Sequence, residues 1–162
     1  MADTTTRAVM DEYLHALLDG SDFGRFFAPD VVWTTMETGE EVRGRDEVRH
    51  LIQAIHTQAF QAQPELVNLL TGDGTAMLEA VFIGTHVGDF AGLPATGVQV
   101  RLPYSMAYDV IEGAITALRA YFPMTALRSQ LAEGGRSVSA PAQQAPGRHA
   151  PGAESRLQMG PR

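Results

Sequence analysis

A long glycine-rich segment between two strand-like stretches constrains the fold of this 162-residue chain more than any other feature. The segment runs from Gly84 to Gly97 and contains four glycines and one proline. Glycine permits tight turns and close backbone approach where a side chain would clash. The residues before it, 77–85, and those after it, 98–111, have strand character. The pattern therefore predicts two strands joined by one long, shaped loop.

The remaining pattern places helices before a meander of antiparallel strands. Apolar residues recur at helical spacing over 10–18 and over 48–59, and a strand is expected between them at 31–35. Beyond Pro64, hairpin-like turns separate further strands, expected at 65–71, 75–85, 98–111 and 114–122. A short helix ending near residue 131 follows. Helices followed by a long antiparallel sheet indicate the α+β class.

Composition limits the possible functions. The hydrophobic content of 44% is sufficient for one core, and no apolar run approaches the roughly 18 residues needed to cross a membrane. Residues 1–6 lack the basic start and apolar stretch of a secretory signal, so we expect a cytoplasmic protein. Without cysteine there is no disulfide and no thiolate nucleophile. The net charge of −7 argues against a nucleic-acid partner, because phosphate binding relies on clustered cations.

The C-terminal segment differs in composition from the rest of the chain. Gly134 and Gly135 are expected to end the last helix. Proline, alanine, glutamine, glycine and serine dominate 134–162, so this tail is predicted to be disordered, and 1–133 to form the folded domain. Two roles remain open for the tail, a tolerated extension and a binding segment.

Strand alternation divides the side chains of 98–111 between two faces. One face is apolar apart from two phenols and carries Val100, Leu102, Tyr104, Met106, Tyr108 and Val110. On the final strand, 114–122, one face carries Leu118, Ala120 and Phe122, while Arg119 and Tyr121 share the other. We expect the apolar faces of both strands to point into the interior.

The glycine loop, the paired strands and the ending Arg-Ala-Tyr-Phe at 119–122 resemble the SnoaL-like polyketide cyclases, a branch of the nuclear-transport-factor-2-like superfamily. The matching sequence spans roughly 26–131. The resemblance implies a cone-shaped, strongly curved antiparallel sheet closed by N-terminal helices. It also implies a homodimer and a cofactor-independent reaction on a hydrophobic polyketide-like intermediate, as in antibiotic biosynthesis and other secondary metabolism.

The last strand departs from the family pattern at its catalytic positions. SnoaL-like aldol cyclases typically carry His-Trp-Asp there, with the aspartate as acid/base, whereas this chain has Leu-Arg-Ala at 118–120. The related limonene-epoxide hydrolases have Trp-Arg-Asp-Tyr-Phe-Asp. This chain keeps the Arg, Tyr and Phe and loses both aspartates, at Ala120 and Pro123. A positioned proton-transfer group contributes roughly 100- to 10,000-fold, so the usual aldol route is not expected.

Four side chains remain as catalytic candidates. Tyr104 and Tyr108 lie four residues apart on one strand, so both hydroxyls can contact one ligand, as in an oxyanion hole; alternatively they are core aromatics. Glu79 lies in an apolar strand, either as a buried proton shuttle with a raised pKa or facing solvent. His86 matches a histidine common in the SnoaL-like motif, and it either transfers protons at the pocket mouth or shapes the loop.

The expected substrate contacts complete the predicted site. They are Trp33, Met106, Leu118, Ala120, Phe122 and Arg119. For Arg119 there is an alternative, an ion pair with Asp109 or Glu79 on a neighbouring strand. No metal site is expected, because His50 and His56 lack the spacing of a metal-binding pair, and no cofactor motif occurs.

Two functions follow from these patterns. The first is an enzyme that cyclises, isomerises or rearranges a hydrophobic substrate, mainly by positioning it. The second is a non-catalytic binder of a small hydrophobic ligand, or a dimeric accessory protein.

Overall fold

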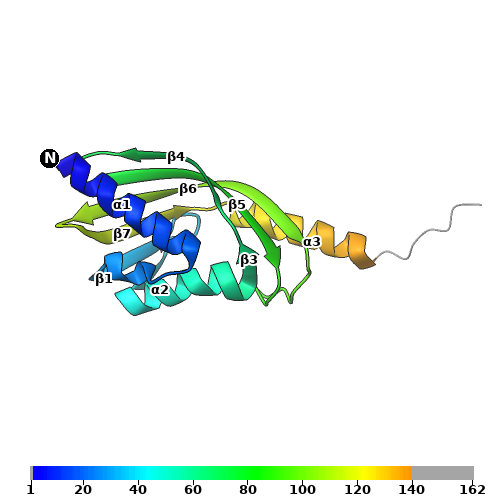
Figure 1. The fold of residues 1–162 in the computed structure, drawn as a ribbon. Helices are drawn as coiled ribbons and strands as arrows, with labels where there is room; N and C mark the ends of the chain where they lie inside the picture. Colours follow the sequence, from blue (N-terminus) through cyan, green and yellow to red (C-terminus); the bar gives the residue numbers. More distant parts are fainter. Residues whose placement is uncertain (1, 140–162) are drawn as a thin grey trace, which may run out of the picture.

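The computed structural model describes the backbone of residues 2–139 and the side chains of residues 5–134. This part of the chain forms the predicted α+β fold of three α-helices and a seven-stranded sheet (Figure 1). The helices are α1 (Ala2–Asp19), α2 (Arg45–Gln53) and α3 (Met124–Ser139). The strands are β1 (Phe27–Thr35), β2 (Glu40–Arg43), β3 (Phe60–Ala62), β4 (Glu65–Thr71), β5 (Thr75–His86), β6 (Gln99–Ile111) and β7 (Ala114–Tyr121).

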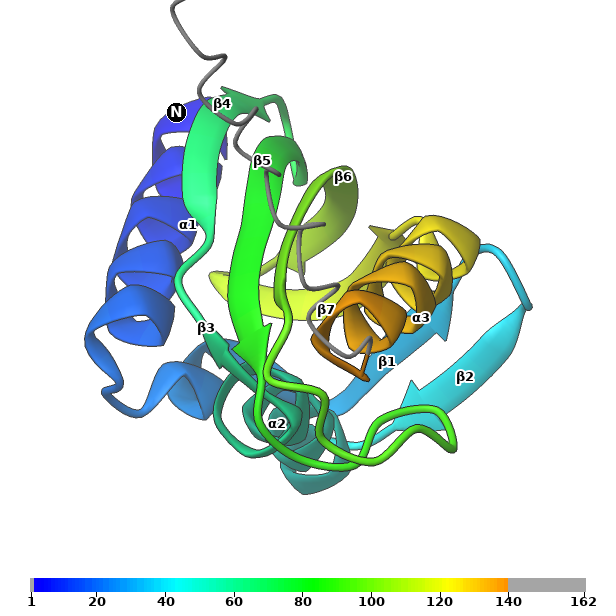
Figure 2. The same cartoon turned by 90° about the vertical axis from the view of Figure 1, so that its right-hand side faces the viewer.

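The sheet has the order β2-β1-β7-β6-β5-β3, with β4 pairing with a second stretch of β5. All neighbours are antiparallel except β1 and β7, which run parallel. Figure 2 shows that the sheet curls strongly, with α1, α2 and α3 around it. Helix α1 contacts β4 and β5, α2 contacts β1, and α3 contacts β6. This arrangement leaves the concave face of the sheet directed toward the helices.

Helix α1 forms where the apolar spacing predicts it. Met10, Tyr13 and Leu14 are buried, and Gly20 follows the helix with a φ of +78°, a conformation that glycine adopts without strain. Leu18, which the spacing placed on the same stripe, is 55% exposed, so the buried stripe ends one turn earlier. No helix in the described range 2–139 is long and apolar enough to cross a membrane.

The sheet differs from the prediction at β1 and β3. Strand β1 begins at Phe27 rather than at Val31. Its register with β7 shifts between Phe27 and Val32, and Pro29 lies in this irregular stretch. Strand β3 was not predicted. It has only three residues and follows the preceding helical segment without a turn signal. Gln63 bridges β3 and β4, and its N–H donates to the carbonyl of Ile83 at 2.8 Å.

The predicted helix end at Gly134 and Gly135 is wrong, since α3 continues to Ser139. Gly134 lies against Val98, and a Cβ built there would lie 2.7 Å from both Val98 methyl groups. Glycine therefore serves close packing at this position and does not end the helix. The rest of the predicted tail, 140–162, lies outside the described residues.

The second helix changes form before it reaches the sheet. Helix α2 passes into a π-helical segment, Ala54–Ala59, which leads directly into β3. The glycine loop packs on this segment, and the N–H groups of Val87 and Gly88 donate to the Ala59 carbonyl at 2.9 and 3.1 Å. A Cβ on Gly88 would overlap the Gln58 carbonyl oxygen. The close backbone approach predicted for this loop is thus present at Gly88.

Gly88→Ala is expected to lower the free energy of unfolding by about 1–3 kcal/mol, because the methyl group forces the loop away from Gln58. Urea unfolding of wild type and variant measures the difference. Gly72→Ala is the matched control, since the nearest atom to its added Cβ is the hydroxyl oxygen of the exposed Thr75, at 3.3 Å. Equal stabilities for the two variants would contradict the close approach.

Candidate functional site

A cavity of about 560 Å³ is lined by residues of the concave face of the sheet and of the helices. Its wall is mostly apolar and includes Leu51, Ile52, Phe60, Leu78, Phe82 and Phe122. Pockets of this size and character enclose small apolar ligands and orient them with a few polar groups. The chemistry of the site therefore depends on which polar atoms reach the wall.

Three tyrosines from two elements meet at the cavity. Tyr104 and Tyr108 lie on the inward face of β6, as the alternation predicts, and Tyr13 comes from α1. The ring centroids of Tyr13 and Tyr108 are 5.9 Å apart, and the two rings meet edge-on. Sequence reasoning missed Tyr13, although it interrupts the apolar stripe of a helix with a polar group.

Burial keeps all three phenols neutral. It raises the pKa of Tyr104 to about 12 and raises the pKa values of Tyr13 and Tyr108 further. The neighbouring Tyr104 adds to this effect and raises the pKa of both Tyr13 and Tyr108. The wall thus carries neutral hydrogen-bond donors suited to a carbonyl oxygen.

Other predicted substrate contacts also lie on the cavity wall. Trp33, Met106, Ala120 and Phe122 all line it. The Trp33 indole N–H donates to the Thr35 hydroxyl at 3.1 Å, which orients the ring. Ala120 is buried and presents only a methyl group to the cavity.

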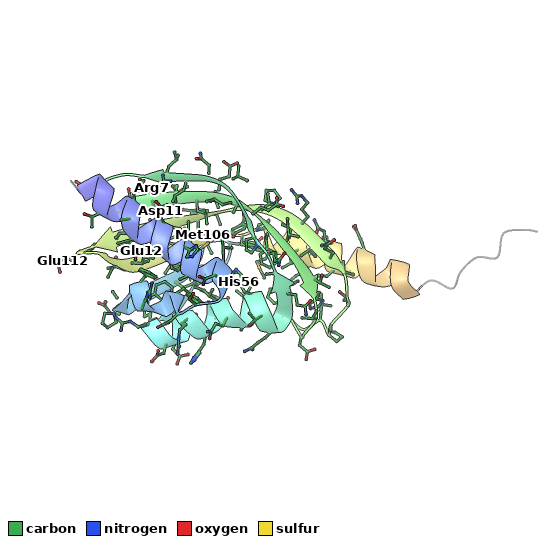
Figure 3. The ribbon with its side chains drawn as sticks, in the orientation of Figure 1. Arg7, Asp11, Glu12, His56, Met106 and Glu112 are labelled. Carbon is green, nitrogen blue, oxygen red and sulfur yellow. The ribbon has the colours of Figure 1, made fainter. Side chains whose placement is uncertain are left out.

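His56 also lines the cavity and was not among the predicted site residues. It lies on the π-helical segment, four residues after Ile52, and the apolar stripe around it was the available signal. Its Nδ1 donates to the Ile52 carbonyl at 2.9 Å, and its ring packs edge-on against Phe82. Burial lowers the pKa of His56, opposed in part by the hydrogen bond to Ile52. In Figure 3, His56 and Met106 approach the interior from the helix side and the sheet side.

The placement of His86 at the pocket mouth is wrong. Its side chain is fully buried and packs on Phe60, which itself lines the cavity, so His86 lies one layer behind the wall. The N–H of Thr96 donates to Nδ1 at 3.2 Å, and the Thr96 hydroxyl contacts the same nitrogen at 2.9 Å. These contacts support the alternative in which His86 shapes the glycine loop.

Glu79 and Arg119 lie on the outer face of the sheet and do not reach the cavity. Glu79 is exposed because it alternates along β5 with the buried Leu78 and Ala80. Arg119 donates two hydrogen bonds of 2.9 Å to the carboxylate of Asp109, the ion pair that was its predicted alternative. The hydrogen bonds to Asp109 raise the pKa of Arg119. The readings of Glu79 as a buried shuttle and Arg119 as a substrate contact are therefore corrected.

Leu118 faces inward as predicted but is not a wall residue. It is fully buried and belongs to the larger apolar core together with Phe27 and Ile115. Ala120, one alternation further along β7, reaches the wall instead. Along β7, the cavity wall therefore begins at Ala120 and not at Leu118.

Charged groups gather at one rim of the cavity. Glu37, Glu40 and Arg128 contribute to the lining and are exposed. The Thr125 hydroxyl, at the start of α3, donates to Glu37 at 3.0 Å. Polar exposed residues between β1, β2 and α3 thus mark an opening to solvent, while the deeper wall is apolar.

The lowered pKa of His56 predicts a stability change with pH. Below about pH 6.5, the ordinary histidine pKa, the unfolded chain binds a proton that buried His56 does not accept until lower pH. The free energy of unfolding should therefore fall as the pH falls below 6.5, and His56→Gln should lose less stability between pH 7.5 and 5. Urea unfolding at both pH values measures this. Exposed His50→Gln is the control; a His56→Gln variant with the wild-type pH dependence would contradict the burial.

Solved structures of low sequence identity share this fold. A candidate SnoaL-like polyketide cyclase from Jannaschia sp. CCS1 has a TM-score of 0.73 at 15% identity, over 80% of this chain and 93% of that one. A candidate polyketide cyclase from Xanthomonas campestris pv. campestris has a TM-score of 0.71 at 22% identity, over 81% and 99%. A candidate ketosteroid isomerase from Kribbella flavida DSM 17836 has a TM-score of 0.60 at 18% identity, over 90% and 86%.

These likenesses confirm the nuclear-transport-factor-2-like α+β fold. No curated protein matches the chain. The family model described as SnoaL-like polyketide cyclase matches residues 6–131, which include most of α1, the whole sheet and the first half of α3. By this match, the chain belongs to the SnoaL-like polyketide cyclase family.

Proposed function

We propose that this protein is a cofactor-independent enzyme that polarises the carbonyl group of an apolar, polyketide-like substrate and promotes its cyclisation, isomerisation or rearrangement. The observation that carries the proposal is the pair of neutral phenols, Tyr13 and Tyr108, side by side on the wall of a mostly apolar cavity. Membership of a cyclase family and the fold shared with a candidate isomerase support the reaction class.

The chemistry follows from where charge develops. Removing a proton from the carbon next to a carbonyl moves an electron pair onto the carbonyl oxygen. Phenol donors placed in advance in an apolar site stabilise that oxyanion more strongly than water does. The enolate formed in this way either attacks a second carbonyl and closes a ring, or is reprotonated at another carbon. A cavity that holds the reacting atoms close together lowers the barrier further.

The biological setting belongs to the same proposal. A polyketide-like substrate places the enzyme in secondary metabolism, such as antibiotic biosynthesis, in the cytoplasm. A homodimer formed through the outer face of the sheet is part of the proposal by family analogy. Leu70 on β4, Met77 on β5 and Tyr121 on β7 are exposed apolar side chains that are compatible with such a contact.

A second candidate function is a binder of small hydrophobic ligands without catalysis, alone or as an accessory subunit. Ala120 favours it, because the family's acid/base position carries a methyl group here. A binder would hold a ketone in the cavity without exchanging its protons. The two candidate functions therefore differ in whether the bound ketone exchanges its protons with the solvent.

The test is hydrogen–deuterium exchange of 2-tetralone, an apolar bicyclic ketone with acidic protons next to the carbonyl. The protein is incubated with the ketone in deuterated, cofactor-free buffer, and mass spectrometry follows deuterium uptake. Trp33, the single tryptophan of the chain, lines the cavity, so its fluorescence reports occupancy. Exchange well above the buffer rate supports the enzyme. Quenched fluorescence with exchange at the buffer rate favours the binder, and no uptake of the ketone contradicts both.

A further inference from the structure

One buried nitrogen of a residue that lines the cavity lacks a hydrogen-bond partner. Among the described side chains, three buried nitrogens have none: Nε of Arg49, Nε2 of His56 and Nε2 of His86. Only His56 lines the cavity. Buried polar atoms are normally paired, so an unpaired one beside a ligand-sized space points to a partner supplied by the ligand.

The hydrogen bonds define which nitrogen of His56 carries the proton. A carbonyl oxygen only accepts, so Nδ1 must donate its proton to Ile52. The lowered pKa keeps the ring neutral at pH 7, and Nε2 therefore has a free electron pair. His86 has the opposite arrangement, because its Nδ1 accepts from the Thr96 N–H and the ring proton lies on Nε2. Of these two histidines, only His56 has the protonation state of a base.

The backbone holds this base in a fixed position near Tyr104. His56 lies in the π-helical segment, a rare conformation that occurs often at functional sites. The hydrogen bonds from Val87 and Gly88 to Ala59 fix the end of that segment. The rings of His56 and Tyr104 both pack edge-on against Phe82, with centroids 6.2 and 6.4 Å from it. The imidazole and a phenol thus flank one aromatic ring on the same cavity wall.

We propose that His56 is the catalytic base of this site and takes the place of the aspartate that the family carries at the position of Ala120. This inference rests on the proposed function. The Nε2 electron pair takes the proton next to the substrate carbonyl, and the C–H electron pair becomes the C=C bond of an enolate. The carbonyl oxygen receives the π electrons and accepts hydrogen bonds from the tyrosine hydroxyls.

The same histidine completes the reaction. After proton transfer the ring is an imidazolium, and its Nδ1–H remains on the Ile52 carbonyl, which stabilises the positive charge. If the enolate carbon attacks a second carbonyl, the imidazolium returns the proton to the new alkoxide. If no ring forms, it returns the proton to a different carbon. In both cases His56 ends neutral. Catalytic hydrogen bonds often form only with bound substrate, so the shielded position of Nε2 is consistent with this role.

The groups facing the cavity from the surrounding elements set the pH dependence. They are Tyr13 on α1, Glu37 and Glu40 around β2, Tyr104 and Tyr108 on β6, and Arg128 on α3. The phenols stay neutral through the range in which a histidine titrates. The pKa of His56 responds to burial and to Ile52. The exchange rate should therefore fall on the acid side, at a pH lower than the value of about 6.5 at which an ordinary histidine titrates, as His56 becomes protonated.

The experiment compares 2-tetralone exchange by wild type, His56→Gln and His50→Gln, with occupancy measured by Trp33 fluorescence. His56→Gln should retain binding, lose at least about 100-fold in exchange rate and lose the acid limb of the pH profile. His50→Gln, an exposed change on the same helix, should match wild type. In His56→Ala, added imidazole should restore part of the exchange, which a purely structural role would not allow.

The outcomes separate this inference from the proposed function. If wild type exchanges the ketone and His56→Gln exchanges it equally fast, the base is another group and the inference fails while the proposed function stands. If folded wild type does not exchange the ketone, the proposed function fails and the base fails with it. As a check independent of the ketone, nitrogen-15 NMR of the free protein should show the His56 proton on Nδ1 at pH 7; a proton on Nε2 would overturn the inference.

Discussion

Tyr108→Phe is expected to slow 2-tetralone exchange by about 100- to 1,000-fold at saturating ketone. Tyr108 lines the cavity, and burial keeps its hydroxyl neutral, so the phenol can donate a hydrogen bond to the carbonyl oxygen of the ligand. Phenylalanine keeps the ring but removes this donor. The cost to folding should be only about 1–3 kcal/mol, because the apolar packing is retained.

Mass spectrometry of deuterium uptake measures this effect, and urea unfolding verifies that the variant is folded. Tyr121→Phe is the matched control, since Tyr121 lies on the outer face of β7 and is 47% exposed. Its exchange rate should equal that of wild type. A folded Tyr108→Phe variant with unchanged exchange would remove Tyr108 from the mechanism and leave it a packing role.

Ala120→Leu is expected to weaken 2-tetralone binding at least tenfold, or about 1.4 kcal/mol. The larger side chain extends from β7 into space that the ligand needs, because Ala120 is buried and lines the cavity. Since the added carbons enter a cavity rather than a packed core, the free energy of unfolding should change by less than about 1.5 kcal/mol. Titration of Trp33 fluorescence gives the affinity.

Ala117→Leu provides the comparison for this change. Ala117 lies on the same strand with the opposite orientation, beside the outward-facing Arg119 and away from the cavity. Its substitution should leave the ketone affinity unchanged. Equal affinities for the Ala120 and Ala117 variants would show that the ligand occupies a different place from the cavity described above.

Much of the sheet was predictable because short-range signals define it. A glycine-containing turn separates β4 from β5. The alternation along β6 correctly placed Tyr104 and Tyr108 on the inward face. The limits of prediction lie where the outcome depends on packing between distant segments. Gly134 has the sequence signature of a helix end, but in the fold it packs against Val98 inside α3. The three residues of β3 form a strand only because they pair with β5.

The candidate site was predicted only in part for the same reason. Glu79 lies outside because the register of β5 turns Leu78 and Ala80 inward, and a single strand does not reveal which of its faces is buried. Tyr13 and His56 join the site from helices that are distant in sequence from β6 and β7. Each interrupts an apolar helical stripe with a polar group, and this was the signal available in the sequence.

The central claim is that the cavity converts its ligand and does not merely hold it. The most direct test is mass spectrometry of a metabolite extract from the source organism, before and after incubation with the purified protein, together with the molecules that the protein retains. The account predicts that one metabolite is replaced by a product of equal mass or of mass lower by one water. A metabolite that is captured in the cavity and recovered unchanged would contradict the account and identify the protein as a binder.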